Sequence, residues 1–444
     1  MPLFGLKDAT TGVFASYAAR FAGLDPRPAW LLELRQEAFA RFTELGFPHH
    51  KMEGWRQTNT APIARAAFET QALLPPAQLV PRLRALDLPG VDWSPQAPRL
   101  VFVNGAYAPG LSSTALPAGC RMGSLGERFA RDGFDLKPYL DYADQREQAF
   151  VALNTSFLAD GAWIEIPPRT VLAQPITILQ LTTGSAASKG ISHPRTLVLA
   201  GKESQCALVE TSAGFDGDVY LTNAVVAFEV GDNAQVEYTR IEQDSCAAFH
   251  VSTLRARQGR DSRFTAHSIS LGGALVRNSV HCILDGEGSE CLLNGLFALD
   301  GNQHVDNSTV LDHAKPLGTS REYYKGVLDN QAVGVFNGRI IVRQDAQHTD
   351  AIQSSKNLLL SDSAATISTQ PQLEIYADDV RCTHGATVGQ LDAQALFYLR
   401  SRGLGVEESR KLLIYAFAAD VLSRVKAPGL REKLEAVLWR KWTA

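Results

Sequence analysis

The sequence has no excess of charge of one sign and no long apolar run. Its 444 residues carry 43 lysines and arginines against 47 aspartates and glutamates, a formal net charge of −4. A basic field is what gathers nucleic acid or an anionic lipid surface, so we expect neither as a partner. No uninterrupted stretch of about eighteen apolar residues occurs, and we therefore expect no segment that spans a membrane.

Cysteine is scarce and widely spaced. The six cysteines, at positions 120, 206, 246, 282, 291 and 382, form no CxxC pair. This argues against a zinc ribbon and against a disulfide framework. The opening residues 1–21 contain Asp8 and no continuous apolar stretch, which is a poor match to a secretory signal. We therefore predict the reducing cytoplasm as the location of the protein.

The common enzyme motifs are also missing. The sequence has no GxxxxGK[ST] phosphate loop, no GxGxxG after a predicted strand, no GxSxG elbow and no HExxH. We therefore expect that the chain has no nucleotide of its own and is not an enzyme.

What is present is a chain whose apolar period changes along its length. The 45% hydrophobic content is typical of a globular protein with a sizeable core. Residues 1–96 form a predicted N-terminal helical region, because apolar residues fall at helical spacing from Ala29 to Leu45 and Gly46 ends that helix. Residues 391–444 form a predicted C-terminal helical domain. Its run from Leu412 to Ala419 is apolar on nearly every side and must be covered by its own domain or by a partner.

Between these regions, residues 97–390 alternate as strands do, apart from a predicted helical insert at about 125–158. Gly201, Gly231, Gly259 and Gly286 each precede an alternating run, and these glycines are nearly evenly spaced along the chain. Repeated strand-and-turn units are typical of a solenoid, in which each rung buries its face only against its neighbours. No helical pattern separates the strands, which argues against a βαβ sheet. The spacing alone leaves a β-sandwich or a jelly roll open.

The stretch from Pro371 to Gly405 has the most distinctive chemistry. Its β-forming residues predict two short strands on either side of an Asp378–Asp379 turn. Side chains two apart share a face of a strand, so Cys382 and His384 are expected side by side, about 6.6 Å apart. Gly385 then permits a tight turn or admits another backbone. The structural alternative is a buried cysteine beside a histidine that is hydrogen-bonded to a neighbouring rung.

A second polar group occurs in the run HVDNSTVLDH, residues 304–313. Its imidazoles and carboxylates together suit iron or zinc. The spacing matches no standard metal motif, so His304 and His313 are the weaker metal candidates, and exposed polar residues on one rung are the alternative.

Several runs together resemble one protein family. The run LEIYADDVRCTHGATVGQLD, residues 373–392, followed by LFYLRSRG, is similar to the C-terminal signature of the SufB/SufD scaffold family of the Suf iron–sulfur cluster assembly machinery. The SufB branch has a glutamate after the motif histidine and a cysteine before the run NLLLS, whereas this chain has Gly385 and the run Ser354 to Lys356 at those places. The chain therefore resembles the SufD branch. Further agreeing runs are ALN at 152–154, YKGVL at 324–328, FNG at 336–338 and NLLLS at 357–361.

The resemblance implies a fold and a set of partners. The fold is a mainly β protein with a right-handed parallel β-helix core between the two helical regions. The function is that of a scaffold acting with SufB and the ATPase SufC in building and transferring nascent clusters. SufB is expected to form a heterodimer through the β-helix, and the isolated chain can form a homodimer. SufC is expected to bind the C-terminal helices, where Leu413 and Phe417 form or support its surface, so truncation after Gly403 should remove SufC binding and leave the β-helix folded.

The resemblance also places the nascent cluster at the SufB interface, near His384 and Cys382. Clusters are usually held by about four thiolates, with histidine as an occasional substitute. One cysteine and one histidine cannot complete such a site, so we expect a transient iron–sulfur cluster shared with SufB.

Two alternatives remain. A stand-alone β-helix polysaccharide lyase or hydrolase requires a groove lined with paired carboxylates or a basic residue, and usually a secretion signal. A SufB-type scaffold that holds the cluster mainly by itself is disfavoured by the missing cysteine near Lys356.

Overall fold

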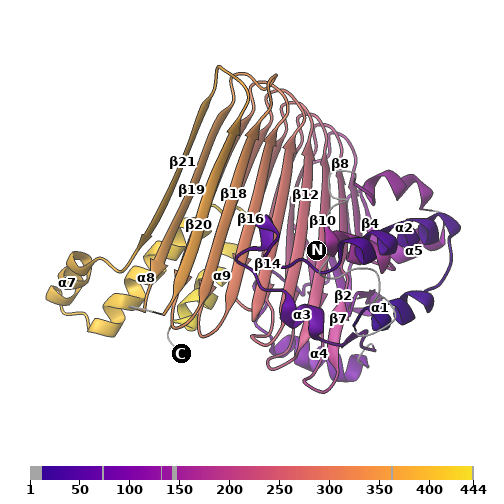
Figure 1. The fold of residues 1–444 in the computed structure, drawn as a ribbon, viewed down its shortest axis with the longest axis horizontal. Coiled ribbons are helices and arrows are strands. Elements are labelled where there is room, and N and C mark those ends of the chain that lie inside the picture. Colours follow the sequence, from indigo (N-terminus) through magenta and orange to yellow (C-terminus); the bar gives the residue numbers. More distant parts are fainter. Residues whose placement is uncertain (1–12, 73–74, 132, 143–147, 362–363, 443–444) are drawn as a thin grey trace.

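The computed structural model describes residues 13–72, 75–131, 133–142, 148–361 and 364–442. Much of the segment judged a poor secretory signal therefore lies outside the described residues. Within them, no helix is both long enough and apolar enough to cross a bilayer. Two large sheets run the length of the molecule, and helices gather at both ends (Figure 1).

Successive strands alternate between the two sheets, so each turn of the chain adds one strand to each sheet. Pairing is parallel through the body of both sheets, while β4–β5 and β2–β3 pair antiparallel. This parallel β-solenoid confirms the predicted β-helix core and excludes a sandwich or jelly roll, whose sheets are antiparallel. The first sheet contains β4 (Arg121–Ser124), β5 (Ala162–Ile166), β8 (Arg195–Ala200), β10 (Tyr220–Val230), β12 (Phe249–Gln258), β14 (Leu275–Leu284), β16 (His304–His313), β18 (Val333–Val342) and β20 (Thr366–Ile375), with β7 (Lys189–Ser192) and β1 (Phe68–Glu69) beside it. The second contains β3 (Ala106–Tyr107), β2 (Arg99–Val103), β6 (Ile176–Leu181), β9 (Gln205–Ala213), β11 (Gln235–Gln243), β13 (Arg263–Ser270), β15 (Glu290–Leu299), β17 (Thr319–Leu328), β19 (Asp350–Leu359) and β21 (Arg381–Gly389).

The glycine-spaced repeat of the sequence corresponds to one full turn of the solenoid. In the pairing of β10 with β12, Leu221 lies opposite Phe249, so one turn of the chain matches the interval between successive glycines of the repeat. The turns stack so closely that a Cβ atom on Gly286 would lie 2.1 Å from the backbone nitrogen of Arg260 in the turn before it. Glycine recurs here because any side chain would collide with the preceding turn.

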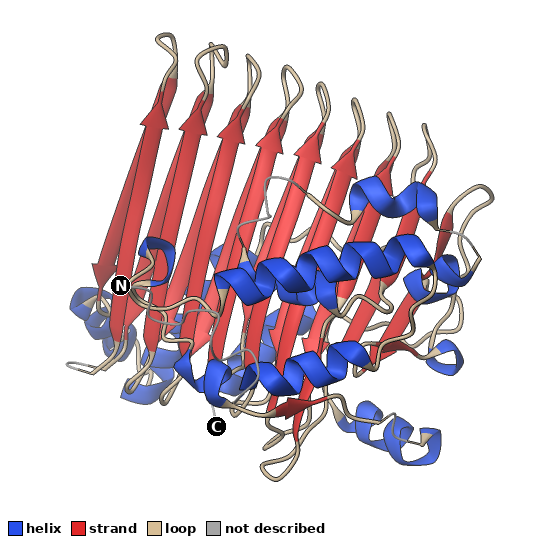
Figure 2. Ribbon diagram, turned by 45° about the vertical axis from the view of Figure 1, so that its right-hand side comes forward, coloured by secondary structure: helices blue, strands red, loops and turns tan. Residues whose placement is uncertain are grey.

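The N-terminal helices cover the outer face of the first sheet. Helix α2 (Ala29–Leu45) has the predicted limits and lies across the strands together with its neighbours (Figure 2). Phe42 and Phe150 pack there on Leu221 and Val251 of the sheet. The strand β1 in this region was not predicted. The other elements of this region are α1 (Val13–Ala22), η2 (Glu53–Trp55), α3 (Ala61–Arg65) and η3 (Pro109–Leu111), and the helical insert contains α5 (Leu125–Ala130), η4 (Phe134–Tyr139) and α6 (Ala149–Ser156). Helix α4 (Pro76–Ala85) packs instead on the second sheet, where its Leu83 is buried with Leu179 of β6.

The C-terminal helices are α7 (Ala393–Ser401), α8 (Val406–Leu422) and α9 (Leu430–Lys441). Ala418 of α8 and Leu434 of α9 are buried in one cluster with Ile241 and Ile269, on the outer face of the second sheet. Removing α8 and α9 would expose this apolar face to water. The expectation that truncation after Gly403 leaves the β-helix folded stays a prediction, and this contact argues for a loss of stability in the truncated chain.

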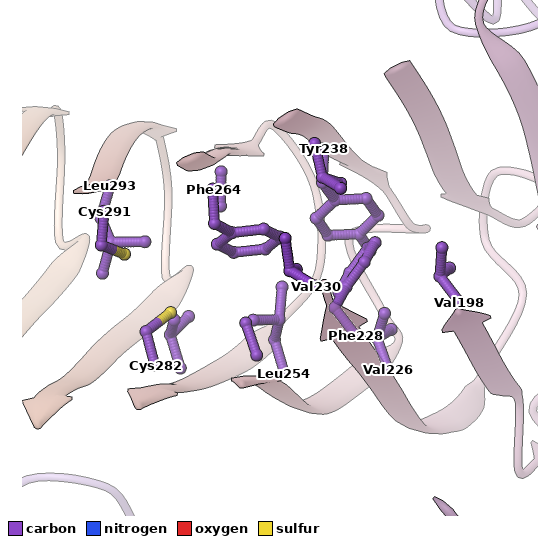
Figure 3. Packing of buried hydrophobic residues seen from close by; sticks show 14 of the residues in the cluster. Val198, Val226, Phe228, Val230, Tyr238, Leu254, Phe264, Cys282, Cys291 and Leu293 are labelled. Carbon is purple, nitrogen blue, oxygen red and sulfur yellow. The ribbon is translucent and has the colours of Figure 1, made fainter. Parts of the chain in front are cut away.

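The interior of the solenoid holds the main apolar core. Phe228, Tyr238, Leu254 and Phe264 come from four strands and point toward one another between the sheets (Figure 3). Cys282 and Cys291 belong to the same cluster, as free and buried thiols.

Candidate functional site

The last turn of the solenoid forms an open end. It consists of β20 and β21, and each is the outermost strand of its sheet among the described residues. Figure 1 shows both at the end of the stack farthest from the N-terminal helices. The strands are ten and nine residues long, and in β21 every residue except Cys382 is exposed.

Cys382 and His384 lie on the inward face of this last turn. Cys382 pairs with Ala351 and His384 with Gln353, and both of these partners are fully buried residues of β19. Residues in register on neighbouring strands share a face, so the two side chains cap the interior at its open end. The predicted common face is confirmed. Gly385 lies within β21 with no atom within 4 Å of a Cβ position, so it forms no tight turn, and the space for another backbone remains.

The thiol and the imidazole differ in their surroundings. Cys382 packs against the apolar interior, and this burial raises the pKa of its thiol. The thiol is therefore neutral until a metal displaces its proton. His384 is exposed and makes no hydrogen bond to the residues that the structure describes. Both side chains are chemically suited to bind iron, and both can be reached from outside the solenoid.

These two donors form only part of a cluster site. Over the described part of the chain, no group of three or more His, Cys, Asp or Glu side chains could hold a metal ion. A cluster needs about four ligands, so this end of the solenoid fits an iron–sulfur cluster only if a second chain completes the site.

The weaker metal candidates do not meet. His304 and His313 are the first and last residues of β16, about 30 Å apart at about 3.3 Å per residue. The Nε2 atom of His304 lies 3.2 Å from Thr58 Oγ1. The Nε2 atom of His313 lies 2.9 Å from Ser320 Oγ, and burial lowers the pKa of His313 to about 4. A metal role for either residue stays a prediction that this geometry does not strengthen.

Two buried residues behind the pair were not anticipated from the sequence. Gln353 is 1% exposed and donates its amide to the carboxylate of Glu322, itself 2% exposed, at 2.5 Å. Burial raises the pKa of Glu322 to about 7. Strand register aligns Glu322, Gln353 and His384 in one column. Register depends on the whole turn between two strands, so no local pattern marks this column.

The C-terminal helices present an apolar surface beside the residues expected to bind SufC. Leu413 and Phe417 are half-buried, and the Lys325 ammonium lies 4.3 Å from the Phe417 ring centroid. Helix α7, in contrast, has no buried residue. Phe397 is 72% exposed and Tyr398 is 56% exposed. Helix α7 therefore offers the more accessible apolar side chains.

Comparison with known proteins relates most of the chain to one family. The family model described as "SUF system FeS cluster assembly, SufBD core domain" matches residues 182–417. The model of the SufBD protein N-terminal region matches residues 24–178. The two matches together include the N-terminal helices from α2 onward, nearly all of the solenoid and most of α8.

Curated relatives agree with the chain over most of their length. An iron–sulfur cluster assembly SufBD family protein of Synechocystis sp. is 33% identical over 417 residues, covering 91% of this chain and 89% of the relative. The iron–sulfur cluster assembly protein SufD of Escherichia coli is 30% identical over 405 residues, 90% of each chain. SufD of Bacillus subtilis is 26% identical over 450 residues, covering 96% of this chain and 97% of the relative. The similarity thus extends far beyond the short stretch around His384.

Proposed function

This chain belongs to the SufBD family of the SUF iron–sulfur cluster assembly system and has a scaffold role in that system, and we propose that its open solenoid end provides part of the site on which a nascent cluster forms. The observation that carries the proposal is the accessible placement of Cys382 and His384 at the end of the stack. SufB supplies the remaining ligands. The cluster is a transient cargo that is passed on, and the chain catalyses no reaction itself and works in the cytoplasm. Family membership gives no support to the polysaccharide lyase alternative.

SufB pairs with the free edges of β20 and β21 in this proposal. A long edge strand presents unpaired backbone N–H and C=O groups, which a strand of another chain can satisfy. Ile375, Tyr376 and Val388 are large, apolar and exposed on or beside these edges, so pairing would also bury apolar surface. The same edges can accept a second copy of this chain, which supports a homodimer when the chain is isolated.

SufC binds the C-terminal helices, with α7 at the centre of the contact. Phe397 and Tyr398 supply the exposed apolar side chains of α7, and Leu412 of the next helix, α8, is also exposed. Leu413 and Phe417 support this surface from the half-buried side of α8. Nucleotide binding and hydrolysis belong to SufC, which matches the absence of a phosphate loop in this sequence.

Co-expression with SufB and SufC, followed by purification of the complex, tests the site. His384→Ala removes a nitrogen donor, and Cys382→Ser removes the sulfur donor at nearly constant size. Each variant is expected to lower the iron content several-fold while the complex forms normally, roughly the effect of losing one ligand. His50→Ala, an exposed histidine of the N-terminal region, serves as the control and should leave the iron content unchanged. Normal iron content in both site variants, or loss of the complex in both, would refute the assignment.

A further inference from the structure

The interior column of side chains that ends at His384 changes from apolar to polar residues in its last three turns. From turn to turn, pairing register aligns Leu208, Tyr238, Ala266, Leu293, Glu322, Gln353 and His384. The first four are apolar or aromatic members of the main core, whereas the last three are polar. Burying a carboxyl group and an amide at core positions costs free energy, so their presence directly behind His384 points to a role there.

The side-chain amide of Gln353 is held in one orientation. Its Nε2 donates to Glu322 Oε2 at 2.5 Å. Space for this contact exists because Gly338 lacks a side chain, and a Cβ atom there would lie 2.0 Å from Nε2. The nitrogen and oxygen of a planar amide point in different directions, so Oε1 faces away from Glu322. Oε1 is buried and has no hydrogen-bond partner among the described residues.

We propose that Gln353 is a positioning residue for His384: the ring, which makes no hydrogen bond to the described residues, turns inward and donates its N–H to the unpartnered Gln353 Oε1. Neighbouring strands lie about 4.8 Å apart, which brings in-register side chains within hydrogen-bond reach. The bond leaves the other ring nitrogen unprotonated and turned outward, where it can bind iron. Metal-binding histidines generally donate their second N–H to a carbonyl or carboxylate, which fixes the tautomer and the ring orientation. This inference rests on the proposed role of His384 and adds the residues that orient it.

Glu322 acts through Gln353. An ionised carboxylate accepts hydrogen bonds but cannot donate them, so the amide must turn its NH₂ group toward Glu322 and its oxygen toward the open end. The pKa of Glu322, raised by burial to about 7, means that the carboxylate is mostly ionised at pH 8. Without Glu322, either face of the amide could point toward His384, and the acceptor would be present only part of the time.

The test compares two buried amides on the same strand. Gln353→Met keeps the size of the side chain and removes the acceptor. Asn357→Leu is the matched control, because Asn357 is also a buried amide of β19 but pairs with Val388 rather than with His384. In the complex with SufB and SufC at pH 8, anaerobic Fe²⁺ titration should show about tenfold weaker binding in Gln353→Met. Binding in Asn357→Leu should stay within about twofold of the wild type.

A second readout separates orientation from general damage. In the full-length chain labelled with ¹⁵N-histidine, a hydrogen-bonded ring N–H of His384 should exchange slowly enough to give a signal, identified by its loss in His384→Ala. The signal should vanish in Gln353→Met and persist in Asn357→Leu. Wild-type Fe²⁺ affinity in Gln353→Met, or a ring N–H signal unchanged in that variant, would overturn the inference.

Two further variants keep the test decisive. Glu322→Gln preserves shape while freeing the amide to flip, so Fe²⁺ affinity should fall by a smaller factor, about threefold, even if Gln353→Met misfolds. Unchanged affinity in Glu322→Gln would contradict the proposed orientation. His384→Ala distinguishes the proposed function from the positioning role of Gln353. Normal iron content in His384→Ala would refute the proposed function itself. A loss of iron in His384→Ala, together with wild-type Fe²⁺ affinity in Gln353→Met, would refute only the positioning role.

Discussion

The two ends of the solenoid differ in how their outermost strands are paired. At the N-terminal end, β4 pairs antiparallel with β5, and β3 pairs antiparallel with β2. Behind them, the buried guanidinium of Arg195 donates to Asn154 Oδ1 at 3.0 Å and to Thr155 Oγ1 at 2.6 Å. At the C-terminal end, β20 and β21 are outermost, and no other strand of the described residues pairs with their free edges. Covered edges protect a β protein from association, so these long free edges support the contact with SufB proposed above.

The buried carboxyl groups follow the same division. Glu210, toward the N-terminal end, accepts hydrogen bonds from Tyr238, Thr196 and Gln180 at 2.9 to 3.3 Å. Glu322, toward the open end, accepts a hydrogen bond from the side-chain amide of Gln353. Burial raises the pKa of both carboxyl groups. Glu210 thus belongs to a hydrogen-bonded network of the closed end, whereas Glu322 lies with Gln353 in the column that ends at His384.

The largest effect is expected at the closed end, where Asn154→Ala should remove about 4 kcal/mol from the free energy of unfolding. The substitution leaves the buried Arg195 guanidinium without its Asn154 partner and also removes the amide that donates to Pro194 O and Asn223 O. Urea denaturation measures the loss. Arg263→Ala, which breaks an exposed ion pair with Glu290, is the control and should cost less than about 1 kcal/mol. Equal losses in the two variants would show that this network does not hold the closed end.

A pH-dependent effect of about 3 kcal/mol is expected from Glu322. Burial raises its pKa from the ordinary 4.5 to about 7, so the folded chain keeps a proton that the unfolded chain releases. The stabilising contribution is complete below about pH 4.5 and is lost as the pH rises through about 7. Glu322→Gln does not titrate, so its stability relative to the wild type should increase between pH 4.5 and pH 8 by about 3 kcal/mol. Urea denaturation at both pH values measures the stability difference between Glu322→Gln and the wild type. A difference that is the same at both pH values would contradict the raised pKa.

Two glycines near the open end should respond differently to alanine. A Cβ atom on Gly338 would meet Gln353 Nε2 at 2.0 Å inside the solenoid, and Gly338→Ala should cost about 1 to 3 kcal/mol. Gly385 has no atom within 4 Å of its Cβ position, so Gly385→Ala should change the stability by less than about 0.5 kcal/mol. Thermal or urea unfolding of the two variants, side by side, locates the boundary between packed interior and open end. A large loss in Gly385→Ala would mean that the last turn is covered in solution.

The smallest effect is expected from His384→Ala in the isolated chain. The ring is exposed and would lose at most the single hydrogen bond proposed to Gln353, so the stability should fall by less than about 1.5 kcal/mol. Differential scanning calorimetry of the pure chain checks this. A loss of several kcal/mol in the free energy of unfolding would mean that His384 stabilises the fold rather than forming part of an open site.

Local sequence patterns were sufficient to predict features that depend only on neighbouring residues. Helical spacing and the stop at Gly46 predicted α2 with its limits, because a helix depends on residues three and four apart. The two-residue period of a strand was enough to place Cys382 and His384 on one face. The glycine repeat predicted stacked turns, whereas the choice between solenoid and sandwich required the family resemblance, because both contain alternating strands.

The sequence by itself therefore determined the strands, the repeat and the Cys382–His384 pair, and only the tertiary structure decided what lies behind and beside that pair. Glu322, Gln353 and His384 lie on three successive strands of one sheet, far apart along the chain. These residues align only because each intervening segment completes one turn of the solenoid. The same holds for α8 and α9, whose apolar faces are buried on strands far earlier in the chain. Register and packing depend on the closure of whole turns, and no short stretch of sequence contains that information.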